Sequence, residues 1–551
     1  MKIGIFHGYT LKAAGSNEYT RYLAKTLADQ GHEVHVICRE REYEEIDFLT
    51  KVISWDQSGQ PGVLVDKKNK KTKCVLHIIP RDPLLPVYLT DKQRSGNVKS
   101  FCDITDAELE AFEEQNVMLL RNILTQHKVD LLFCNHLVYQ PEIARQVCPS
   151  LKIPFAIFPH GSSIEYTVTR DHRYKEVGAK VLEECNALIN CSTEMHDRIK
   201  NLYPELRAKI ATKVHASGVG VDTGKFHYVE PSKRSESIKK IAPLKPGGGK
   251  PQVLKDKLKK ELAAGDFESV TCYHNTYNTK CPDEGILKAL QDRDWSRYTL
   301  FYAGALTVGK GVQTLITALP AIAKEHPDVQ LIIAGAGSYR EVLEGLVYAI
   351  ESGDKKLLMH LTNNGFDLDK NNLVGPWEDV KEYLRDRRNL ETVFEYGKNL
   401  SERVIFTGYV NHDILQHIFP CADVGIFPSI LSEASPLVMG ESLASGVIPI
   451  VSNSTGFRCG WDDLEGLIDP EIHKHMLIDM TPGSRVQSLV NSVTNLQKCK
   501  DIPGHQRDLH MLAKKRYDWK LRAAELTEVF NKILKVYHNN PEKNLDLKRV
   551  V

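Results

Sequence analysis

Two glutamates, Glu433 and Glu441, stand at a spacing that suits the binding of a sugar and a nucleotide. Strand-like apolar runs at 423–427 and 447–451 flank them, with a helix-like segment between. Glu433 is therefore expected on the loop after the first strand, and Glu441 about two helical turns further on. Ligands of open α/β sheets bind at the carboxyl ends of the strands. Both carboxylates should accept hydrogen bonds from hydroxyls there, and the helix N-terminus offers N–H groups to a diphosphate.

Apolar runs predict two β-loop-α-β halves that position these residues. The first half has a strand at 2–6 and another at 34–38. Between them, Tyr19, Leu23 and Leu27 stand four residues apart, which predicts the apolar face of a helix. The second has strands at 299–303 and 329–334 around another amphipathic segment. Further strands are predicted at 130–134, 155–158, 404–407, 424–427 and 447–451, and the apolar stretch 182–190 is of uncertain type. Two Rossmann-like halves predict an α/β protein with two facing domains and an interdomain cleft.

Length and composition limit the class of protein. The chain has 551 residues, enough for two large domains, and its formal net charge of +1 gives no reason to expect nucleic acid as a partner. Twelve scattered cysteines predict reduced thiols in a cytoplasmic protein. Cys272, His274 and Cys281 lack a second close pair, so we expect no zinc site there.

No targeting or membrane-spanning segment is expected. The first apolar run is too short for a signal peptide. No stretch approaches eighteen continuous apolar residues, the length that a transmembrane helix needs. Peripheral membrane contact and homo-oligomer formation stay open.

Two insertions interrupt the second half of the chain. Residues 231–263 are rich in lysine and contain PLKPGGGKP, which favours a flexible, exposed linker over a basic patch for an anionic acceptor, a membrane or another subunit. Residues 338–400 are charged and helix-prone, and are expected to cover the cleft or support oligomers. A second lysine run at 67–73 predicts a hairpin tip, and residues 539–551 a polar tail.

Several strand ends carry polar residues suited to a phosphorylated sugar. His160 follows the strand at 155–158 within PHGSS, and Lys310 lies in GALTVGKG after the strand at 299–303. A lysine near a loop of backbone amides suits a phosphate. His160 can donate to a sugar hydroxyl. The alternatives are a structural histidine bonded to loop backbone and an ordinary exposed lysine. His7 and His136 also end strands, and are either acceptor-binding or structural.

Together these stretches resemble the retaining glycosyltransferase family 4, which has the GT-B fold. The E-x7-E pair lies within FPSILSEASPLVMGESLASGVIPIVS, and SGVGVDTGKF and FTGYV resemble further family segments. The family's arginine is absent, because Ala305 stands in its place. Arg458, expected in the loop after Thr455, is a hypothetical substitute. EASP replaces the commoner E-G-F-G, which leaves room for the sugar.

The resemblance implies roles for individual residues. Lys310 would stabilise the leaving diphosphate, Glu433 would bind the 3- and 4-hydroxyls of the donor sugar, and Glu441 would bind the ribose. The implied catalytic residues are His160, Lys310 and Glu433. The implied donor-binding residues are Gly15, Ser16, Gly304, Lys310, Gly408, Ala434, Ser435, Pro436, Leu437 and Glu441. Gly15 and Ser16 are equally consistent with a simple helix start. No metal and no other cofactor is implied.

The resemblance also implies a division of the chain and a reaction. The expected parts are an acceptor domain at 1–225 with a returning helix at 520–540, a linker with the basic insertion at 226–295, a donor domain at 296–519 and a tail at 541–551. The expected reaction moves a hexose, with UDP-glucose the first choice of donor, to an unidentified small-molecule, glycan or lipid acceptor. The alternatives are a nucleotide-sugar epimerase and, because of Ala305, a catalytically weak scaffold of the same fold.

Overall fold

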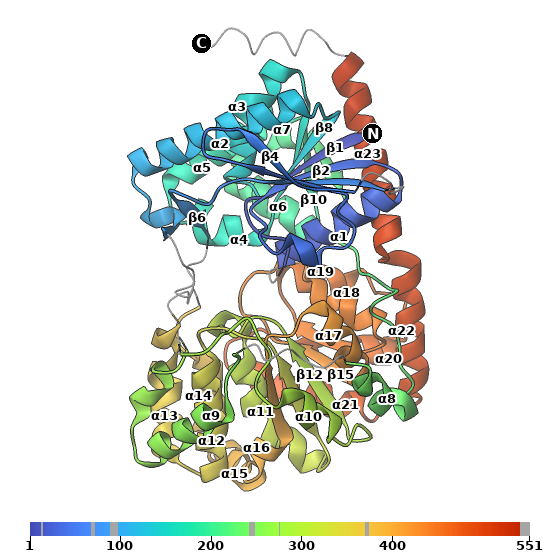
Figure 1. Cartoon of the computed structure of the whole chain (residues 1–551). Helices are drawn as coiled ribbons and strands as arrows, with labels where there is room; N and C mark the ends of the chain where they lie inside the picture. The colour runs from blue at the N-terminus through green and yellow to red at the C-terminus, as the bar shows by residue number, and fades with distance from the viewer. Residues whose placement is uncertain are drawn as a thin grey trace. The chain divides into compact units, whose positions relative to one another are not determined.

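The computed structural model describes residues 1–12, 15–67, 72–88, 97–241, 248–274, 276–369 and 374–539 (Figure 1). The chain divides into two compact units. Unit 1 comprises Met1–Gly220 and Tyr517–Val551, and unit 2 comprises Val221–Arg516. The units thus change at Gly220 and Tyr517, where the sequence predicts changes at 225 and 520. Most of the lysine run at 67–73 and the tail at 541–551 lie outside the described residues.

Unit 1 is built on one sheet with the order β11-β10-β9-β8-β1-β2-β5-β3-β4 among the described residues. Its strands are β1 (Lys2–Phe6), β2 (Glu33–Cys38), β3 (Lys51–Trp55), β4 (Pro61–Asp66), β5 (Lys73–Ile78), β8 (Leu131–Asn135), β9 (Phe155–Phe158), β10 (Ala187–Asn190) and β11 (Val214–Ala216). All neighbours pair in parallel except β3 with β4. The predicted strands at 2–6 and 155–158 are confirmed, and the uncertain stretch 182–190 holds the end of a helix followed by β10.

Helices cover both faces of this sheet. They include α1 (Gly15–Asp29), α2 (Asp106–Gln126), α3 (Gln140–Leu151), α4 (Gly161–Ser163), α5 (His172–Glu184), α6 (Thr193–Leu202), α7 (Arg207–Ala211) and α23 (Trp519–Asn539), and a small pair of strands, β6 (Leu85–Val87) and β7 (Val98–Ser100), lies beside them. α23, red in Figure 1, packs against α1. Leu23 and Leu27 of α1 share one apolar core with Trp519 and Phe530 of α23. The helical spacing of the first pair predicted this buried face.

Unit 2 contains a second parallel sheet, ordered β14-β13-β12-β15-β16-β17. Its strands are β12 (Thr299–Ala303), β13 (Gln330–Ala334), β14 (Val404–Gly408), β15 (Val424–Phe427), β16 (Ile448–Ser452) and β17 (Leu477–Ile478). The strands from β12 to β16 are almost wholly buried, since helices lie over both faces of the sheet. Continuous apolar runs such as TLFYA and IPIVS therefore predicted them correctly.

Some helices of unit 2 precede β14 in the chain, and the others follow it. The first group is α8 (Arg234–Lys239), α9 (Gln252–Ala263), α10 (Ile286–Gln291), α11 (Val312–Glu325), α12 (Arg340–Ser352), α13 (Lys355–Asn364), α14 (Glu378–Arg385), α15 (Arg387–Tyr396) and α16 (Leu400–Arg403). The second is α17 (His412–Ile418), α18 (Leu437–Ala444), α19 (Thr455–Asp462), α20 (Pro470–His473), α21 (Arg485–Leu496) and α22 (Ile502–Arg516). The helix-prone character of 338–400 is confirmed.

The lysine-rich insertion at 231–263 is not the exposed linker that its composition predicts. It forms α8 and α9, and Leu258 and Leu262 of α9 are buried. Lys250 is fully buried, with its Nζ 2.8 Å from Glu341 Oε1 on α12. The composition misleads because Lys250 is paired with two carboxylates that are distant in sequence, Glu341 and Glu344, and burial of a charge requires such pairing. Residues 242–247, with most of PLKPGGGKP, lie outside the described residues.

Candidate functional site

The strand order of unit 2 places the predicted residues at its topological switch point. The chain passes from β12 outward to β13 and β14 on one side, and then returns to β15 and β16 on the other. The loops after β12 and β15 therefore leave the sheet in opposite directions, which opens a crevice at the carboxyl ends of the two strands. Lys310 lies on the first loop and Glu433 on the second. The structure thus brings together two residues that are distant in sequence.

The two loops are joined by side-chain and backbone contacts. Lys310 Nζ forms an ion pair with Glu433 Oε1, and Ser429 Oγ donates to the same carboxylate oxygen at 2.9 Å. The backbone N–H of Ile430 donates to Gly309 O at 2.7 Å. The Lys310 and Glu433 side chains remain 32% and 18% exposed, so a ligand can reach them. The ion pair holds a cation and an acceptor carboxylate side by side at the crevice.

Glycine is required where the β12 loop meets β15. Gly311 has φ +73°, and a Cβ there would lie 1.9 Å from the carbonyl oxygen of Pro428. Both the left-handed backbone and the close approach exclude a side chain. Gly304 and Gly408 were predicted to bind the donor. Gly304 follows β12 and Gly408 ends β14, at the same edge of the sheet. They bracket β13, because Gly304 N–H donates to Ala334 O at 3.0 Å and Gly335 N–H donates to Gly408 O at 3.1 Å.

The second glutamate lies in α18, as predicted. Pro436 is the N-cap of this helix, and Leu437 is its first residue. Glu441 is 5% exposed, and His412 Nε2 of α17 lies 3.2 Å from its Oε1. The ring of His412 meets the ring of Phe226 edge-on. Sequence reasoning missed His412, whose position after β14 within NHD was the available signal.

The loop that carries Glu433 is held from a third direction by the start of α19. The Glu433 N–H donates to Thr455 Oγ1 at 2.9 Å, and Gly456 N–H donates to the Glu433 carbonyl, also at 2.9 Å. Thr455 has φ +44°, a strained backbone for a β-branched residue. Such strain persists where the surrounding structure over-determines it, and it concentrates at functional sites. Ala434 lies against this turn, since a Cβ at Gly456 would be 2.4 Å from its carbonyl oxygen.

Arg458 belongs to α19, so its expected placement in a loop is wrong. Its Nε lies 2.7 Å from Asp462 Oδ1, its Nη1 donates to Asn453 Oδ1 at 3.0 Å, and its guanidinium stacks over Trp461. A guanidinium engaged in this way must give up these contacts before it can bind a diphosphate. Whether it replaces the absent arginine at Ala305 stays a prediction.

Unit 1 has its own switch point, between β1 and β8. His7 follows β1, and Asn135 ends β8 with His136 after it. A hydrogen-bond network links them. Asn135 Nδ2 lies 3.3 Å from His7 Nδ1 and donates to Thr20 Oγ1 at 2.9 Å, while His7 Nε2 lies 2.9 Å from Asn17 Oδ1. Because Asn135 donates through its amide nitrogen, its Oδ1 is left as an acceptor.

His160 uses that acceptor. It is the N-cap residue of α4, and its Nε2 lies 3.0 Å from Asn135 Oδ1, so Nε2 carries the proton. Burial lowers the pKa of His160 to about 3, which keeps the ring neutral near pH 7. Its Nδ1 is then a lone-pair acceptor. The expectation that His160 donates to a sugar hydroxyl therefore changes, because Nδ1 would accept a hydrogen bond from the hydroxyl.

His136 is the most unusual residue of this cluster. It has φ +72°, is 1% exposed, and neither ring nitrogen has a hydrogen-bond partner among the described residues. Its ring lies 4.8 Å from that of His160 and 4.7 Å from that of Tyr88. Buried polar groups normally have hydrogen-bond partners.

The predicted residues Gly15 and Ser16 begin α1, and they are close in sequence to Asn17, which belongs to the hydrogen-bond network around His7.

Acid is expected to destabilise unit 1 through the buried His7. Burial lowers its pKa to about 4, with Arg39 lowering it further and Asn17 and Glu40 raising it. An unfolded histidine titrates near 6.5, so below that pH the unfolded chain binds more protons and stability falls until about pH 4. We expect a loss of roughly 2 kcal/mol at pH 5 relative to pH 7. Urea unfolding at both pH values should show a flatter pH dependence for His7→Gln. The exposed His172→Gln serves as the control, and equal pH slopes for both variants and the wild type would contradict the assignment.

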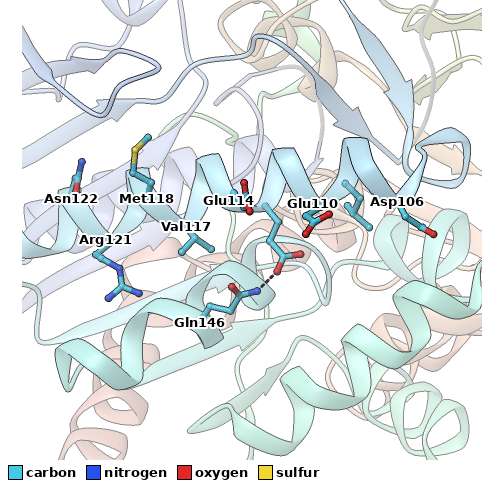
Figure 2. Close-up of a pocket in the computed structure, with 10 residues that line it drawn as sticks. Asp106, Glu110, Glu114, Val117, Met118, Arg121, Asn122 and Gln146 are labelled. Carbon is cyan, nitrogen blue, oxygen red and sulfur yellow. Dashed lines mark hydrogen bonds between the residues drawn. The ribbon is translucent and has the colours of Figure 1, made fainter. Parts of the chain in front are cut away.

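A cavity of about 740 Å³ lies elsewhere in unit 1, along α2 (Figure 2). Figure 2 shows Glu110 and Glu114 on α2, with Gln146 of α3 facing that helix. The lining also contains Asp106 and Glu113. Carboxylates repel phosphate, so this acidic cavity does not suit a nucleotide.

No described helix is both long and apolar enough to span a bilayer.

Two family models, each described as Glycosyl transferases group 1, match residues 288–369 and 367–476. Both matches lie in unit 2 and contain Lys310, Glu433 and Glu441 between them. An uncharacterized glycosyltransferase of Methanocaldococcus jannaschii is 27% identical over 157 residues, which is 28% of this chain and 27% of the relative. The chain thus spans little more than a quarter of the length of that relative.

Solved structures resemble the whole chain at low sequence identity. Sucrose-phosphate synthase from Thermosynechococcus elongatus matches with a TM-score of 0.51 and 16% identity, covering 97% of this chain and 99% of its own. HepE from Anabaena, solved with UDP and glucose, matches with a TM-score of 0.52 and 13% identity over 97% and 100% of the two chains. The catalytic domain of starch synthase IV from Arabidopsis thaliana, bound to ADP and acarbose, gives 0.51 and 12% over 97% and 99%. Residues 288–476 of unit 2 thus match the glycosyl transferases group 1, and the chain has the GT-B fold.

Proposed function

We propose that this protein is a retaining, metal-independent glycosyltransferase that moves a hexose from a nucleotide diphosphate sugar to an acceptor. The observation that carries the proposal is the pairing of Lys310 with Glu433 across the switch point of unit 2. A phosphate needs a cation and a sugar needs hydrogen-bond acceptors, and the two loops supply both within one ion pair.

Donor binding would divide this ion pair between the two parts of the ligand. The diphosphate would take Lys310 Nζ and the backbone N–H groups of the first turn of α18, which begins at Leu437, since the N-cap Pro436 has no N–H to donate. The carboxylate of Glu433 would then accept from the 3- and 4-hydroxyls of the sugar. Ser429 and Thr455 keep that loop in place while the lysine changes partner. Lys310 would exchange Glu433 for the diphosphate, and Glu433 would exchange Lys310 for the sugar hydroxyls. Neither charge would therefore lack a partner when the donor is bound.

Glu441 would bind the ribose hydroxyls. Its carboxylate is buried in α18 and lies beside His412, which restricts its rotation. A restrained acceptor loses little side-chain entropy when the ribose arrives. Gly304 stays a proposed donor contact, whereas a Cβ at Gly408 would lie 2.9 Å from Cys281 O, so the glycine there accommodates the protein's own 281–283 segment.

The reaction would break the bond between the anomeric carbon and the diphosphate oxygen, and form a bond from that carbon to the acceptor oxygen. The acceptor would approach from the face that the diphosphate leaves, which retains the anomeric configuration. Its hydroxyl proton would pass to the departing phosphate oxygen. Lys310 would stabilise the charge that develops on the leaving group. His160 keeps its proposed role toward a sugar hydroxyl, through its acceptor nitrogen Nδ1.

UDP-glucose is the proposed donor. HepE was solved with UDP and glucose, whereas starch synthase IV was solved with ADP, so similar folds accept both bases. A second candidate function is that of a catalytically weak scaffold, and Ala305 in place of the family's arginine favours it. An epimerase, the third candidate, would convert the donor without any acceptor.

Thermal-shift measurements with UDP, GDP, ADP and their glucose and mannose conjugates test the donor site. We expect a rise in Tm with one base, reduced in Glu441→Gln and unchanged in Glu391→Gln, whose side chain is exposed on α15. No shift with any nucleotide would contradict the proposal and favour the scaffold. Donor turnover with and without candidate acceptors then separates transferase from epimerase, and NMR of the product's anomeric proton decides between retention and inversion.

A further inference from the structure

Three histidines of unit 1 converge on one face of its sheet. His35 lies on β2 and His77 on β5, and the parallel register pairs Ile37 with His77, so both imidazoles project to the same side. His127 reaches them from the C-cap of α2. One ring nitrogen from each histidine lies within 4.8 Å of those of the other two. None of these residues belongs to the site described above.

The separations of the rings match those of a metal site. The ring centroids of His35 and His77 are 5.3 Å apart, those of His35 and His127 are 5.3 Å apart, and those of His77 and His127 are 4.8 Å apart. Three imidazoles on a tetrahedral Zn²⁺ ion, with Zn–N bonds of about 2.0–2.1 Å, place their centroids about 5 Å apart. We propose that His35, His77 and His127 bind one Zn²⁺ ion, with water as the fourth ligand.

The tautomer of His35 suits a metal. Glu33 Oε1 lies 3.1 Å from His35 Nε2, which places the proton of His35 on that nitrogen. Its Nδ1 lone pair then faces the centre of the cluster. A carboxylate behind a metal-ligating histidine orients the ring and raises its basicity.

His77 must exchange one hydrogen bond for the metal. Trp55 Nε1–H donates to His77 Nδ1 at 3.2 Å, so without metal the proton of His77 lies on Nε2, which is 2.9 Å from His35 Nδ1. Metal binding at Nε2 moves that proton to Nδ1 and breaks the Trp55 hydrogen bond. No proton leaves the cluster. The free energy with which a structural site binds Zn²⁺ is far larger than the free energy that one such hydrogen bond contributes.

The third ligand gives the ion an entry path. His127 is partly exposed, whereas His35 and His77 are buried. The neighbouring lysines are paired with carboxylates: Lys2 lies 3.1 Å and Lys73 3.6 Å from Glu33, and Lys51 lies 3.5 Å from Asp66. Their charge is therefore partly compensated, which limits the repulsion of an incoming cation.

The position of the cluster indicates a structural role for the ion. The histidines at the switch point of unit 1 follow the carboxyl ends of β1, β8 and β9. His127 instead precedes β8, in the connection from α2 that leads to the amino end of the strand. An ion here would tie β2 and β5 to the end of α2. The inference is independent of the proposed transferase activity.

Zinc binding to the untagged full chain, stripped of metal with a chelator, tests this inference. Zn²⁺ is titrated against a chromophoric competitor, and Co²⁺ is added separately to record the visible absorption of a tetrahedral site. We expect one Zn²⁺ ion per chain and a rise in Tm on binding. His127→Ala should weaken binding at least tenfold, because it removes a ligand, and Glu33→Gln should weaken it about tenfold or more.

His215→Ala is the matched control, since His215 is a partly exposed histidine on β11 of the same unit. Circular dichroism checks that each variant is folded. The inference is overturned if the wild type binds no Zn²⁺, or if His127→Ala and His215→Ala bind it as tightly as the wild type does. Equal weakening of Zn²⁺ binding in His127→Ala and His215→Ala would also overturn the inference.

Discussion

Glu433→Gln is expected to lower kcat for sugar transfer by about 100-fold or more while the protein stays folded. The amide keeps the size of the carboxylate but loses the charge that pairs with Lys310 and the strength of the acceptor for sugar hydroxyls. Both side chains are partly exposed, so loss of their ion pair should cost about 1 kcal/mol or less of stability. Steady-state kinetics with the donor selected by the thermal-shift panel measure the effect.

Two further variants make this result interpretable. Lys310→Gln should also lower kcat, because it removes the charge that stabilises the leaving group. The double variant Glu433→Gln/Lys310→Gln should lose less than the product of the two single losses, since the residues act as one pair. Glu391→Gln, on the exposed face of α15, should leave kcat unchanged. A folded Glu433→Gln enzyme with wild-type kcat would show that this carboxylate has no part in transfer.

Lys250→Met is expected to destabilise unit 2 by about 3–5 kcal/mol. The Nζ of Lys250 lies 2.8 Å from Glu341 Oε1, and both side chains are fully buried. Methionine would leave Glu341 with the hydroxyl of Tyr277 but without the neutralising cation. Because two units need not unfold in one step, hydrogen exchange of the α12 amides during urea unfolding is the suitable measurement.

The adjacent helix supplies a matched control. Lys257→Met changes the same residue type on α9, where the side chain is 59% exposed and lies 3.8 Å from Glu261, and should cost under about 0.5 kcal/mol. Adding Glu341→Gln to Lys250→Met should restore part of the lost stability by removing the unpaired charge. Equal stability of the wild type and Lys250→Met would mean that the buried ion pair contributes no net stability.

The strands could be predicted from the sequence because their signal is local. TLFYA and IPIVS are continuous apolar runs, and both form buried strands, β12 and β16. The loop carrying Glu433 and the helix carrying Glu441 followed from the same stretch, since spacing along one helix is fixed by its geometry. The conformational demand on Gly311, in contrast, arises from a close approach to Pro428, which is distant in sequence.

Non-local contacts could not be predicted in this way. His412 meets Glu441 from another helix, and Thr455 holds the Glu433 loop from beyond the next strand. The lysine-rich insertion looked exposed because composition averages over residues, whereas burial of Lys250 depends on two carboxylates of α12, Glu341 and Glu344. Arg458 was expected in a loop, yet it lies in α19 and faces Asp462.

By itself the sequence determined the kind of fold, the order of most strands along the chain and the two glutamates of the candidate site. Only the tertiary structure decided which strands are neighbours, and hence that Lys310 and Glu433 form an ion pair across the switch point of unit 2. It also brought His35, His77 and His127 together from two strands and a helix end. The physical reason is range: apolar periodicity is set by adjacent residues, whereas ion pairs and ligand clusters depend on distances between segments far apart in the chain.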